Sequence, residues 1–555
     1  MQENLSIQNL DHLGIIAGIV DDIGLVEVVN ELVGEDPREQ VSAGVVVKAM
    51  ILNGLGFVSA PLYLFGQFFV GKPTEHLLGR GVLPKHLNDD RIGRVLDQLY
   101  LVGVTAVFMA ICMRAARRYG VAEGSAHLDA TSMSVQGAYL DTGGAATDDG
   151  TVPIAITHGY SRDHRPDLKQ FVLNLVCWGD GDIPAFISLG DGNQSDKASF
   201  ACIMQQFQQQ WDMEGVQVAD SALYSADNLA QMDGLVWISR VPLTVGEANA
   251  LLDAIDESAF VASTLEGYRI AQVCSQYGGV RQRWLVVESA DRKASDLQQQ
   301  GKRLASAGEQ ARRQLDKLKR QSFACAADAQ QAAHQLDVTL KLHRLASVTI
   351  AERPYYQQPG RPAKDALPSA MRYLIEADIE PKAEELARLR RRSGRFILAT
   401  NALASSEFEA NSLSKDEPAT PMPLTADDIL QHYKAQQGTE RGFRFLKDPL
   451  FFTASVFLHS PERIMALAMV MGLCLLVYNL GQRQLRRGLE AAGQAVPNQL
   501  GKPTQTPTLR WIFQSFMAIH LVTMAGQKQV VGLNGNHRLI LRFLGSASQS
   551  YYLLC

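Results

Sequence analysis

One nearly uninterrupted apolar stretch limits what this chain can fold into. It covers residues 464–480 (IMALAMVMGLCLLVYNL) in a chain of 555 residues. A membrane-spanning helix needs about 20 apolar residues, and this stretch is slightly shorter. It is also flanked by four arginines: Arg463, Arg483, Arg486 and Arg487. We therefore expect the central core helix of a globular protein and no association with a membrane.

Composition and charge agree with a globular chain. With 46% apolar and 20% charged residues, and this length, the chain is expected to form two to four folding units. The net charge of −5 gives no global support to nucleic-acid binding,, so any DNA contact must come from local patches. Two basic runs qualify, each equally compatible with a solvated helix face: Arg388, Arg390, Arg391, Arg392 and Arg395; and Lys302, Arg303, Arg312, Arg313, Lys317, Lys319 and Arg320.

The seven cysteines are scattered, without the close Cys or His spacing of a zinc site,. The N-terminus lacks the order of basic, apolar and small residues that marks a secretory signal. We expect reduced thiols and a cytoplasmic protein.

Changes in the pattern of apolar and polar residues divide the chain into five parts. Residues 1–120 have helical periodicity throughout and predict an all-α N-terminal domain, a candidate for DNA binding or dimerisation. Residues 121–242 change to short β-rich runs: three strands, a helix and two further strands, the order expected of an RNase H-like α/β core. A polar insertion domain is expected over 243–424. Residues 425–490 return to the core with two helices, and 491–555 form a linker and a final helical segment.

Two aspartates interrupt strand-like patterns in the predicted core. Asp129 lies in AHLDATSMSV and Asp220 in VQVADSALYS. A buried carboxylate is costly unless it is paired or binds a metal. Each aspartate alone is also compatible with a turn or a helix cap.

A third acid, Glu440, lies in a predicted helix that starts near Thr425 and stops at Pro449. Tyr433, Glu440 and Lys447 follow one another at intervals of seven residues, which keeps them on one helix face because seven steps drift by only about 20°. A phenol, a carboxylate and a cation in a row suit a helix laid along a DNA backbone. An exposed helix with solvated charges would show the same pattern.

These motifs resemble the DDE transposases of bacterial insertion sequences, in particular the sixteen-thirty-four-like group of the insertion-sequence-four superfamily. The helix motif of that superfamily, Tyr-x2-Arg-x3-Glu-x6-Lys, is matched by Tyr433, Glu440 and Lys447, with Gln436 in place of the arginine. The segment THGYSRDHRPDLKQFVLNLVCW is similar to the hairpin that follows the first aspartate in that family, and GDGNQSDKASF and RGFRFLKDPLFF are in the expected order.

The resemblance implies an RNase H-like (retroviral-integrase-type) catalytic core with a large insertion. It implies that Asp129, Asp220 and Glu440 hold two Mg²⁺ or Mn²⁺ ions and catalyse phosphoryl transfer. The expected substrates are the terminal inverted repeats of a mobile element and a target DNA. Joining two ends implies a homodimer or a larger complex.

Five further residues are candidate DNA contacts. They are Tyr433 and Lys447 on the predicted helix, Arg165 in the hairpin, Arg240 at the end of the last core strand, and Arg444 as a replacement for the missing arginine at 436, a role open also to Arg441.

Three alternatives stay open at this point. A metal-dependent nuclease of the same fold would cut DNA without joining it, and the sequence hardly separates it from a transposase. A catalytically inactive DNA-binding protein derived from a transposase is disfavoured by the presence of all three acids. A membrane or structural helical protein rests only on the apolar stretch.

Overall fold

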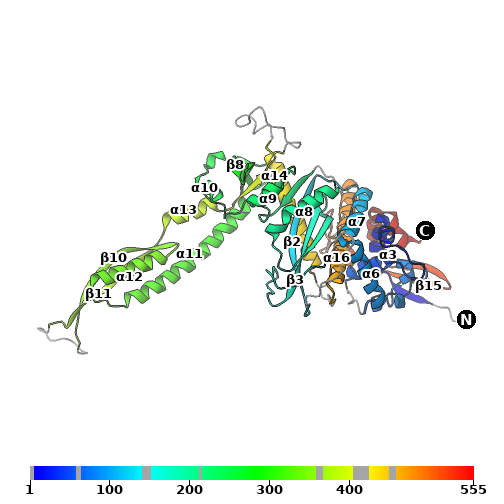
Figure 1. The fold of residues 1–555 in the computed structure, drawn as a ribbon, viewed down its shortest axis with the longest axis horizontal. Coiled ribbons are helices and arrows are strands. Elements are labelled where there is room, and N and C mark those ends of the chain that lie inside the picture. The colour runs from blue at the N-terminus through cyan, green and yellow to red at the C-terminus, as the bar shows by residue number, and fades with distance from the viewer. Residues whose placement is uncertain are drawn as a thin grey trace.

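The computed structural model describes residues 5–57, 64–139, 152–211, 215–357, 367–403, 424–448 and 458–554. Within them the chain forms a mixed α/β body and one long arm (Figure 1). The body has a nine-stranded sheet at its centre and a helical unit on one side of it, while the arm extends away from the opposite end of the sheet.

The sheet has mixed strand directions and the spatial order β4-β3-β2-β5-β6-β12-β9-β8-β7. Only the β2–β5 and β5–β6 pairs are parallel among its described pairings. Its strands are β2 (Ser125–Val135), β3 (Lys169–Trp178), β4 (Ile183–Gly190), β5 (Val216–Ala219), β6 (Trp237–Arg240), β7 (Val261–Ala262), β8 (Tyr268–Tyr277), β9 (Val280–Ser289) and β12 (Arg395–Thr400).

Helices cover both faces of the sheet, as two consecutive residues of β4 demonstrate. Side chains alternate between faces along a strand. Phe186 packs against Phe207 of α8 (Asp196–Trp211), with 6.1 Å between ring centroids. Ile187, the next residue, points to Gly472 of α16 (Pro461–Ala491). Both faces are therefore covered, and β2, β3 and β4 are nearly continuous buried strands, as expected for a central sheet,.

The apolar stretch of the sequence lies within α16, which is the central helix of the body. Its most apolar 18-residue window is 94% buried inside the protein, which confirms the core helix expected from the sequence. On its other side α16 packs against the N-terminal helices, including α3, α6 and α7. Gly472 has a role here, because a side chain at this position would collide with Phe108 of α7.

The N-terminal unit is mostly helical. It comprises α1 (Leu13–Ile23), α2 (Leu25–Val33), α3 (Ala43–Gly54), α4 (Phe65–Phe68), α5 (Thr74–Leu78), the 3₁₀ turn η2 (Pro84–His86), α6 (Asp89–Val102) and α7 (Val104–Tyr119). Residues 6–9 differ from the expected all-α pattern, because they form the strand β1 (Ser6–Asn9) and pair with β15 near the other end of the chain.

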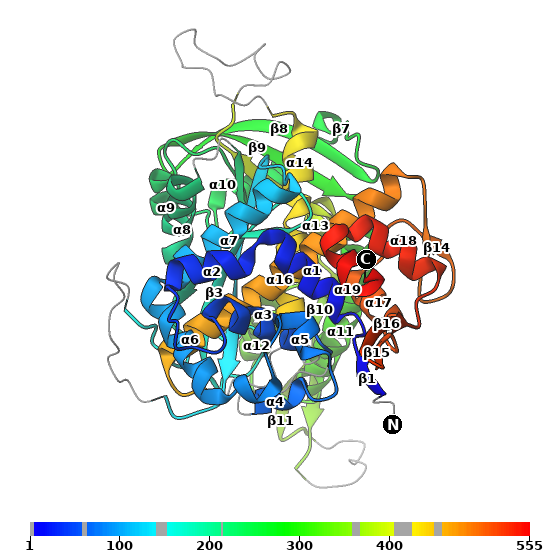
Figure 2. The same ribbon diagram turned by 90° about the vertical axis from the view of Figure 1, so that its right-hand side faces the viewer.

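The two ends of the chain form one unit with the N-terminal helices. Figure 2 shows the blue helices beside the red ones, and α1 packs along α19. The predicted final helical segment is also interrupted by a β-hairpin. The elements are β13 (Val496–Pro497), β14 (Pro503–Thr504), α17 (Leu509–Ser515), β15 (His520–Met524), β16 (Gln527–Val531), α18 (Gly535–Leu544) and α19 (Ser546–Leu553).

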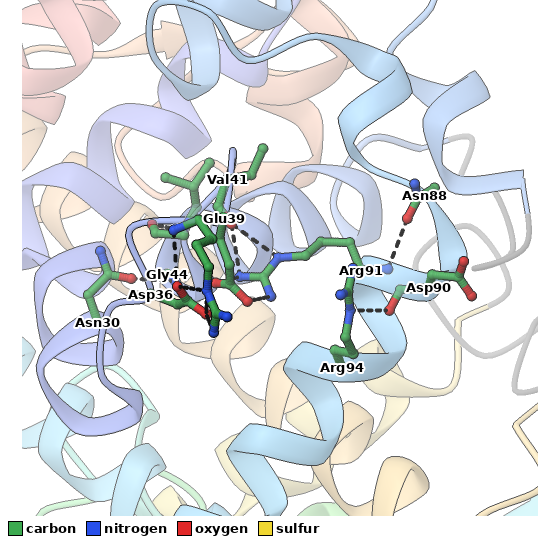
Figure 3. A network of polar contacts seen from close by, with 12 residues as sticks. Asn30, Asp36, Glu39, Val41, Gly44, Asn88, Asp90, Arg91 and Arg94 are labelled. Carbon is green, nitrogen blue, oxygen red and sulfur yellow. Dashed lines mark hydrogen bonds and ion pairs between the residues drawn. The ribbon is translucent and has the colours of Figure 1, made fainter.

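A buried polar network fastens the loop between α2 and α3 to α6 (Figure 3). Arg91 of α6 is only 5% exposed and pairs through both terminal nitrogens with Glu39. Its guanidinium also donates to the carbonyl oxygen of Val41 at 3.1 and 2.8 Å. Close by, Asn30 accepts a hydrogen bond from the backbone of Gly44, where an added Cβ would lie 2.2 Å from a carbonyl oxygen of α2.

The region 243–424 divides into two parts. Strands β7, β8, β9 and β12 extend the central sheet beyond β6, with helices α9 (Ala226–Gln231) and α10 (Gly246–Ala254) and the turn η3 (Glu257–Ala259) nearby. The rest forms the arm: α11 (Ala290–Lys319), α12 (Ala326–Thr339), β10 (His343–Tyr355), β11 (Ala370–Pro381) and α13 (Ala383–Arg392). The arm has its own small core, which includes Leu315, Ala329 and Ile375.

The predicted helix after residue 424 begins as expected but is interrupted. Thr425 and Asp428 form a reciprocal capping box at its start,. The chain then divides at Gln436 into α14 (Ala426–Ala435) and α15 (Gln437–Leu446). Here the backbone bonds run from Gln436 to Tyr433 and from Thr439 to Gln436, each spanning three residues. Such 3₁₀-type tightening changes the phase of the helix.

Candidate active site

Asp129 and Asp220 lie side by side at one end of the parallel strand pair β2–β5. The last paired residues of these strands are Leu128 and Ala219, and an aspartate follows each of them. Neighbouring strands are about 4.8 Å apart. The two aspartates therefore occupy neighbouring places in the sheet.

Local hydrogen bonds fix both side chains. The carboxylate of Asp129 accepts the backbone N–H of Ala130 at 2.8 Å. The carboxylate of Asp220 accepts the N–H of Ala222, also at 2.8 Å, and its carbonyl oxygen accepts the hydroxyl of Ser239 on β6. Each carboxylate keeps further lone pairs for other ligands.

Glu440 reaches the same region from α15, which packs on β2 and β3. The preceding residue, Thr439, is buried, and its hydroxyl donates to the carbonyl oxygen of His127 at 3.5 Å, two residues before Asp129. Glu440 itself is exposed. The close approach of α15 depends on Gly438, since an added Cβ there would lie 1.8 Å from a carboxylate oxygen of Asp182.

The electrostatics of Asp129 reflect this gathering of acids. The pKa of Asp129 is raised to about 7; burial is the largest cause, and the negative charges of Asp220 and Glu440 act in the same direction. The hydrogen bond from Ala130 and the cation of Arg162 act in the opposite direction. A proton on Asp129, or a cation placed between the three acids, would relieve the repulsion.

Sequence reasoning missed two residues beside the acids, Arg162 and Asp196. They form an ion pair, and the backbone N–H of Arg162 donates to the hydroxyl of Ser132 on β2 at 3.1 Å. Burial, together with the charge of Asp220, raises the pKa of Asp196, although Arg162 opposes this. Both residues line a cavity of about 320 Å³ next to Ala222. Both residues could have been found from the motifs that resemble the family, because Arg162 lies in GYSRDHRPDLKQ and Asp196 in GDGNQSDKASF.

Tyr433 and Arg240, two of the predicted DNA contacts, lie together against the sheet. The Tyr433 ring is 6.1 Å from that of Phe396 on β12, and the Arg240 guanidinium lies 5.8 Å from the same ring. Burial raises the pKa of Tyr433, while Arg240 acts to lower it. The helix is interrupted at Gln436, between Tyr433 and Glu440, but the charge of Glu440 still acts on Tyr433 and contributes to raising its pKa.

The other predicted DNA contacts are at the surface. Lys447 is half-buried and forms an ion pair with Asp163 at 2.7 Å. Arg165 is exposed and pairs with Asp167 at 2.7 Å. Gln436, at the position of the family arginine, is buried. Of the two possible substitutes, Arg441 pairs with Asp182 at 3.1 Å, whereas Arg444 is exposed and forms no ion pair within the described part of the chain.

The donor chemistry of the three acids fits hard divalent cations such as Mg²⁺ or Mn²⁺, which prefer oxygen ligands. The side chains are not closed into a cage: within the described ranges, no three His, Cys, Asp or Glu residues are gathered closely enough to hold a metal ion.

Comparison with known protein families adds one match. A model described as a domain of unknown function (DUF4277) matches residues 5–113, which is the N-terminal helical region and excludes all three acids. No curated protein matches the chain.

Proposed function

We propose that this protein is a DNA transposase of the DDE type, which cleaves the ends of a mobile element and joins them to target DNA. The observation that carries the proposal is the approach of Asp129 on β2, Asp220 directly after β5 and Glu440 on α15, near enough for the charges of Asp220 and Glu440 to raise the pKa of Asp129. Asp196 and Arg162 complete the polar surroundings.

The proposal includes an RNase H-like core, and the order of five strands supports it. Strands β4, β3, β2, β5 and β6 follow one another in space, which is the chain order 3-2-1-4-5 counted from β2. The first three are antiparallel neighbours, and the last two run parallel to β2. In this order Asp129 lies on the first strand, Asp220 directly follows the fourth strand, and Glu440 lies on a later helix.

The three carboxylates would hold the two divalent ions that the chemistry needs. Bound there, such ions stabilise the charge that develops on the entering and leaving oxygens of a phosphodiester. Asp129 and Asp220 would share one ion, and Glu440 would complete the second set of ligands. The Arg162–Asp196 pair would orient the DNA strand at the neighbouring cavity.

The reaction has two stages at one site. In the first, water displaces the 3′ oxygen of the DNA strand from phosphorus at the element end, which leaves a 3′-OH and a 5′-phosphate. In the second, that 3′-OH attacks a phosphodiester of the target and displaces its 3′ oxygen. Both are in-line phosphoryl transfers with the same charge requirement. Joining two ends requires at least two copies of the protein in the active complex.

An integration assay tests the proposal. Full-length protein is mixed with Mg²⁺ or Mn²⁺, a supercoiled plasmid and pre-cut end DNA taken from the inverted repeats that flank the coding region. We expect covalent joining of the end DNA to the plasmid. Asp220→Asn should abolish it, while Asp227→Asn, the same substitution at an exposed site of α9, should not.

The outcomes separate the alternatives. Cleavage of end DNA without joining would identify a nuclease of the same fold. Metal-dependent nicking that persists in Asp220→Asn, or its absence from the wild type, would contradict the assignment of the acids and favour a DNA-binding protein without catalysis.

A further inference from the structure

The outer face of α11 in the arm carries a row of cations. Lys302, Arg313, Lys317 and Arg320 are all exposed, and at 100° per residue they fall within about 60° of one another around the helix. The opposite face packs into the core of the arm through Gly308, Ala311 and Leu315. We call these four residues the α11 row.

The α11 row is distinct from the other basic run, in which three of the five arginines are held in ion pairs. Arg388 pairs with Glu385 at 2.8 Å, Arg392 with Asp253, and Arg395 is fully buried between Glu257 and Glu288. Two cations of β10 are also paired, Arg344 with Glu380 at 3.2 Å and Arg353 with Glu376 at 3.7 Å.

The cations of the α11 row are only weakly paired, although two exposed acids, Glu309 and Asp316, lie on the same side of the helix,. Arg313 has one distant contact, with Glu309 at 4.0 Å, and both side chains are largely exposed, at 81% and 70%. Such exposed pairs contribute little. Within the ranges the structure describes, Lys302, Lys317 and Arg320 form no ion pair. Leaving like charges next to one another on a helix is unfavourable by itself, so the row is suited to an anionic partner.

The arm as a whole is basic in an acidic chain. Residues 290–392 contain 20 Lys and Arg against 13 Asp and Glu, a net charge of +7, whereas the entire chain carries −5. The rest of the protein is therefore acidic by 12 charges, since −5 minus 7 is −12. Positive charge is thus concentrated on the arm, which projects from the body (Figure 1).

We propose that the α11 row binds the phosphate backbone of duplex DNA away from the cleavage position. From Lys302 to Arg320 the helix rises about 27 Å, which matches roughly 8 base pairs of duplex. Because α11 has 30 residues, cations on one of its faces can contact several phosphates of a DNA backbone. The inference rests on the proposed function, which makes DNA the substrate; it adds the element that holds the flanking duplex.

The test is DNA binding as a function of salt. The probe is a fluorescent duplex of about 40 base pairs, longer than the ~8 base pairs of the row, with full-length Asp220→Asn protein as the background so that no cleavage occurs. In that background Lys302, Arg313, Lys317 and Arg320 are changed to Gln. Because each phosphate contact releases about 0.9 counterion, the slope of log K against log salt should fall by up to about 4.

A matched control removes four positive charges elsewhere. Arg344→Gln and Arg353→Gln remove paired cations of the arm, and Lys528→Gln and Arg538→Gln remove exposed cations at the far end of the body. We expect this control to keep the affinity and slope of the background protein. Far-UV circular dichroism should be the same for all variants, since each changed side chain of the α11 row is at the surface.

Two results would overturn the inference. One is an unchanged salt slope in the α11 variant. The other is a loss of self-association, seen by sedimentation, with DNA affinity intact, because the row would then be a contact between copies of the chain. Neither depends on whether Asp220→Asn abolishes nicking, so failure of this inference and failure of the proposed function are distinguishable.

Discussion

Asp129 and Asp220 each directly follow the last paired residues of β2 and β5, Leu128 and Ala219, so two acids occupy neighbouring places beside a largely buried sheet. Burial and the charge of Asp220 both work against ionisation of Asp129. The cost of this arrangement is borne by the folded protein alone, because the acids separate when the chain unfolds. Stability and pH should therefore be linked through Asp129.

The first prediction concerns pH. The pKa of Asp129 is about 7 in the folded protein against 3.8 for the free side chain, so between these values the folded state binds a proton that the unfolded state has lost. The free energy of unfolding should then fall as pH rises from about 4 to about 7, by about 2–4 kcal/mol. Urea denaturation across this range measures it. Asp129→Asn should flatten the dependence and Asp227→Asn should not.

The second prediction concerns divalent cations. A ligand that binds only the folded state raises the free energy of unfolding, by about 2.7 kcal/mol at a concentration 100 times its Kd. Mg²⁺ or Mn²⁺ should therefore raise the melting temperature of the wild type above pH ~7, where Asp129 is ionised. Asp129→Asn and Asp220→Asn should lose the shift. If both variants showed the same increase in melting temperature as the wild type, the cation would bind elsewhere.

Much of the site was accessible from sequence because its signals are local. The strand pattern around Asp129 and Asp220 predicted both strands, and the Thr425 and Asp428 pair predicted the start of α14. The apolar run predicted a core helix because no other soluble environment accepts so many apolar side chains,. Each of these inferences needs only neighbouring residues.

Other features could not be predicted because their partners are distant in the chain. Strand β1 has only four residues, and its identity comes from pairing with β15, more than 500 residues later. The strands β8 and β9 join the central sheet through β12, which is again separated in sequence. The pair of Arg162 and Asp196 spans 34 residues, and motif matching alone did not distinguish Arg162 from Arg165.

The third prediction concerns the network around Arg91. Removing one partner of a buried ion pair leaves an uncompensated charge. Arg91→Met would leave Glu39 and the carbonyl oxygen of Val41 without their partner, so it should lower the free energy of unfolding by about 3 kcal/mol. Arg38→Met, which removes a fully exposed pair with Asp36, should have no measurable effect. Chemical denaturation compares the two. Equal effects would show that burial of the guanidinium is unimportant.

The fourth prediction concerns Gly438, whose missing side chain lets α15 approach β2. A Cβ at this position would lie 1.8 Å from a carboxylate oxygen of Asp182. Asp182 cannot easily move aside, because its backbone is left-handed (φ 59°) and its carbonyl accepts from Asn479 at 2.6 Å. Gly438→Ala should displace α15 and with it Glu440, and a misplacement of about 1 Å at such a site costs on the order of 100-fold in rate.

A rescue and a control distinguish this effect from general damage. Replacing Asp182 by Gly in the Gly438→Ala protein removes the collision, so DNA nicking should recover even though the ion pair with Arg441 is lost. Gly301→Ala is the matched substitution, because a Cβ at that position of α11 meets nothing within 4 Å; it should leave nicking unchanged and favour the helix by about 1 kcal/mol. Full nicking activity in Gly438→Ala would mean that the position of α15, and therefore of Glu440, does not matter for catalysis.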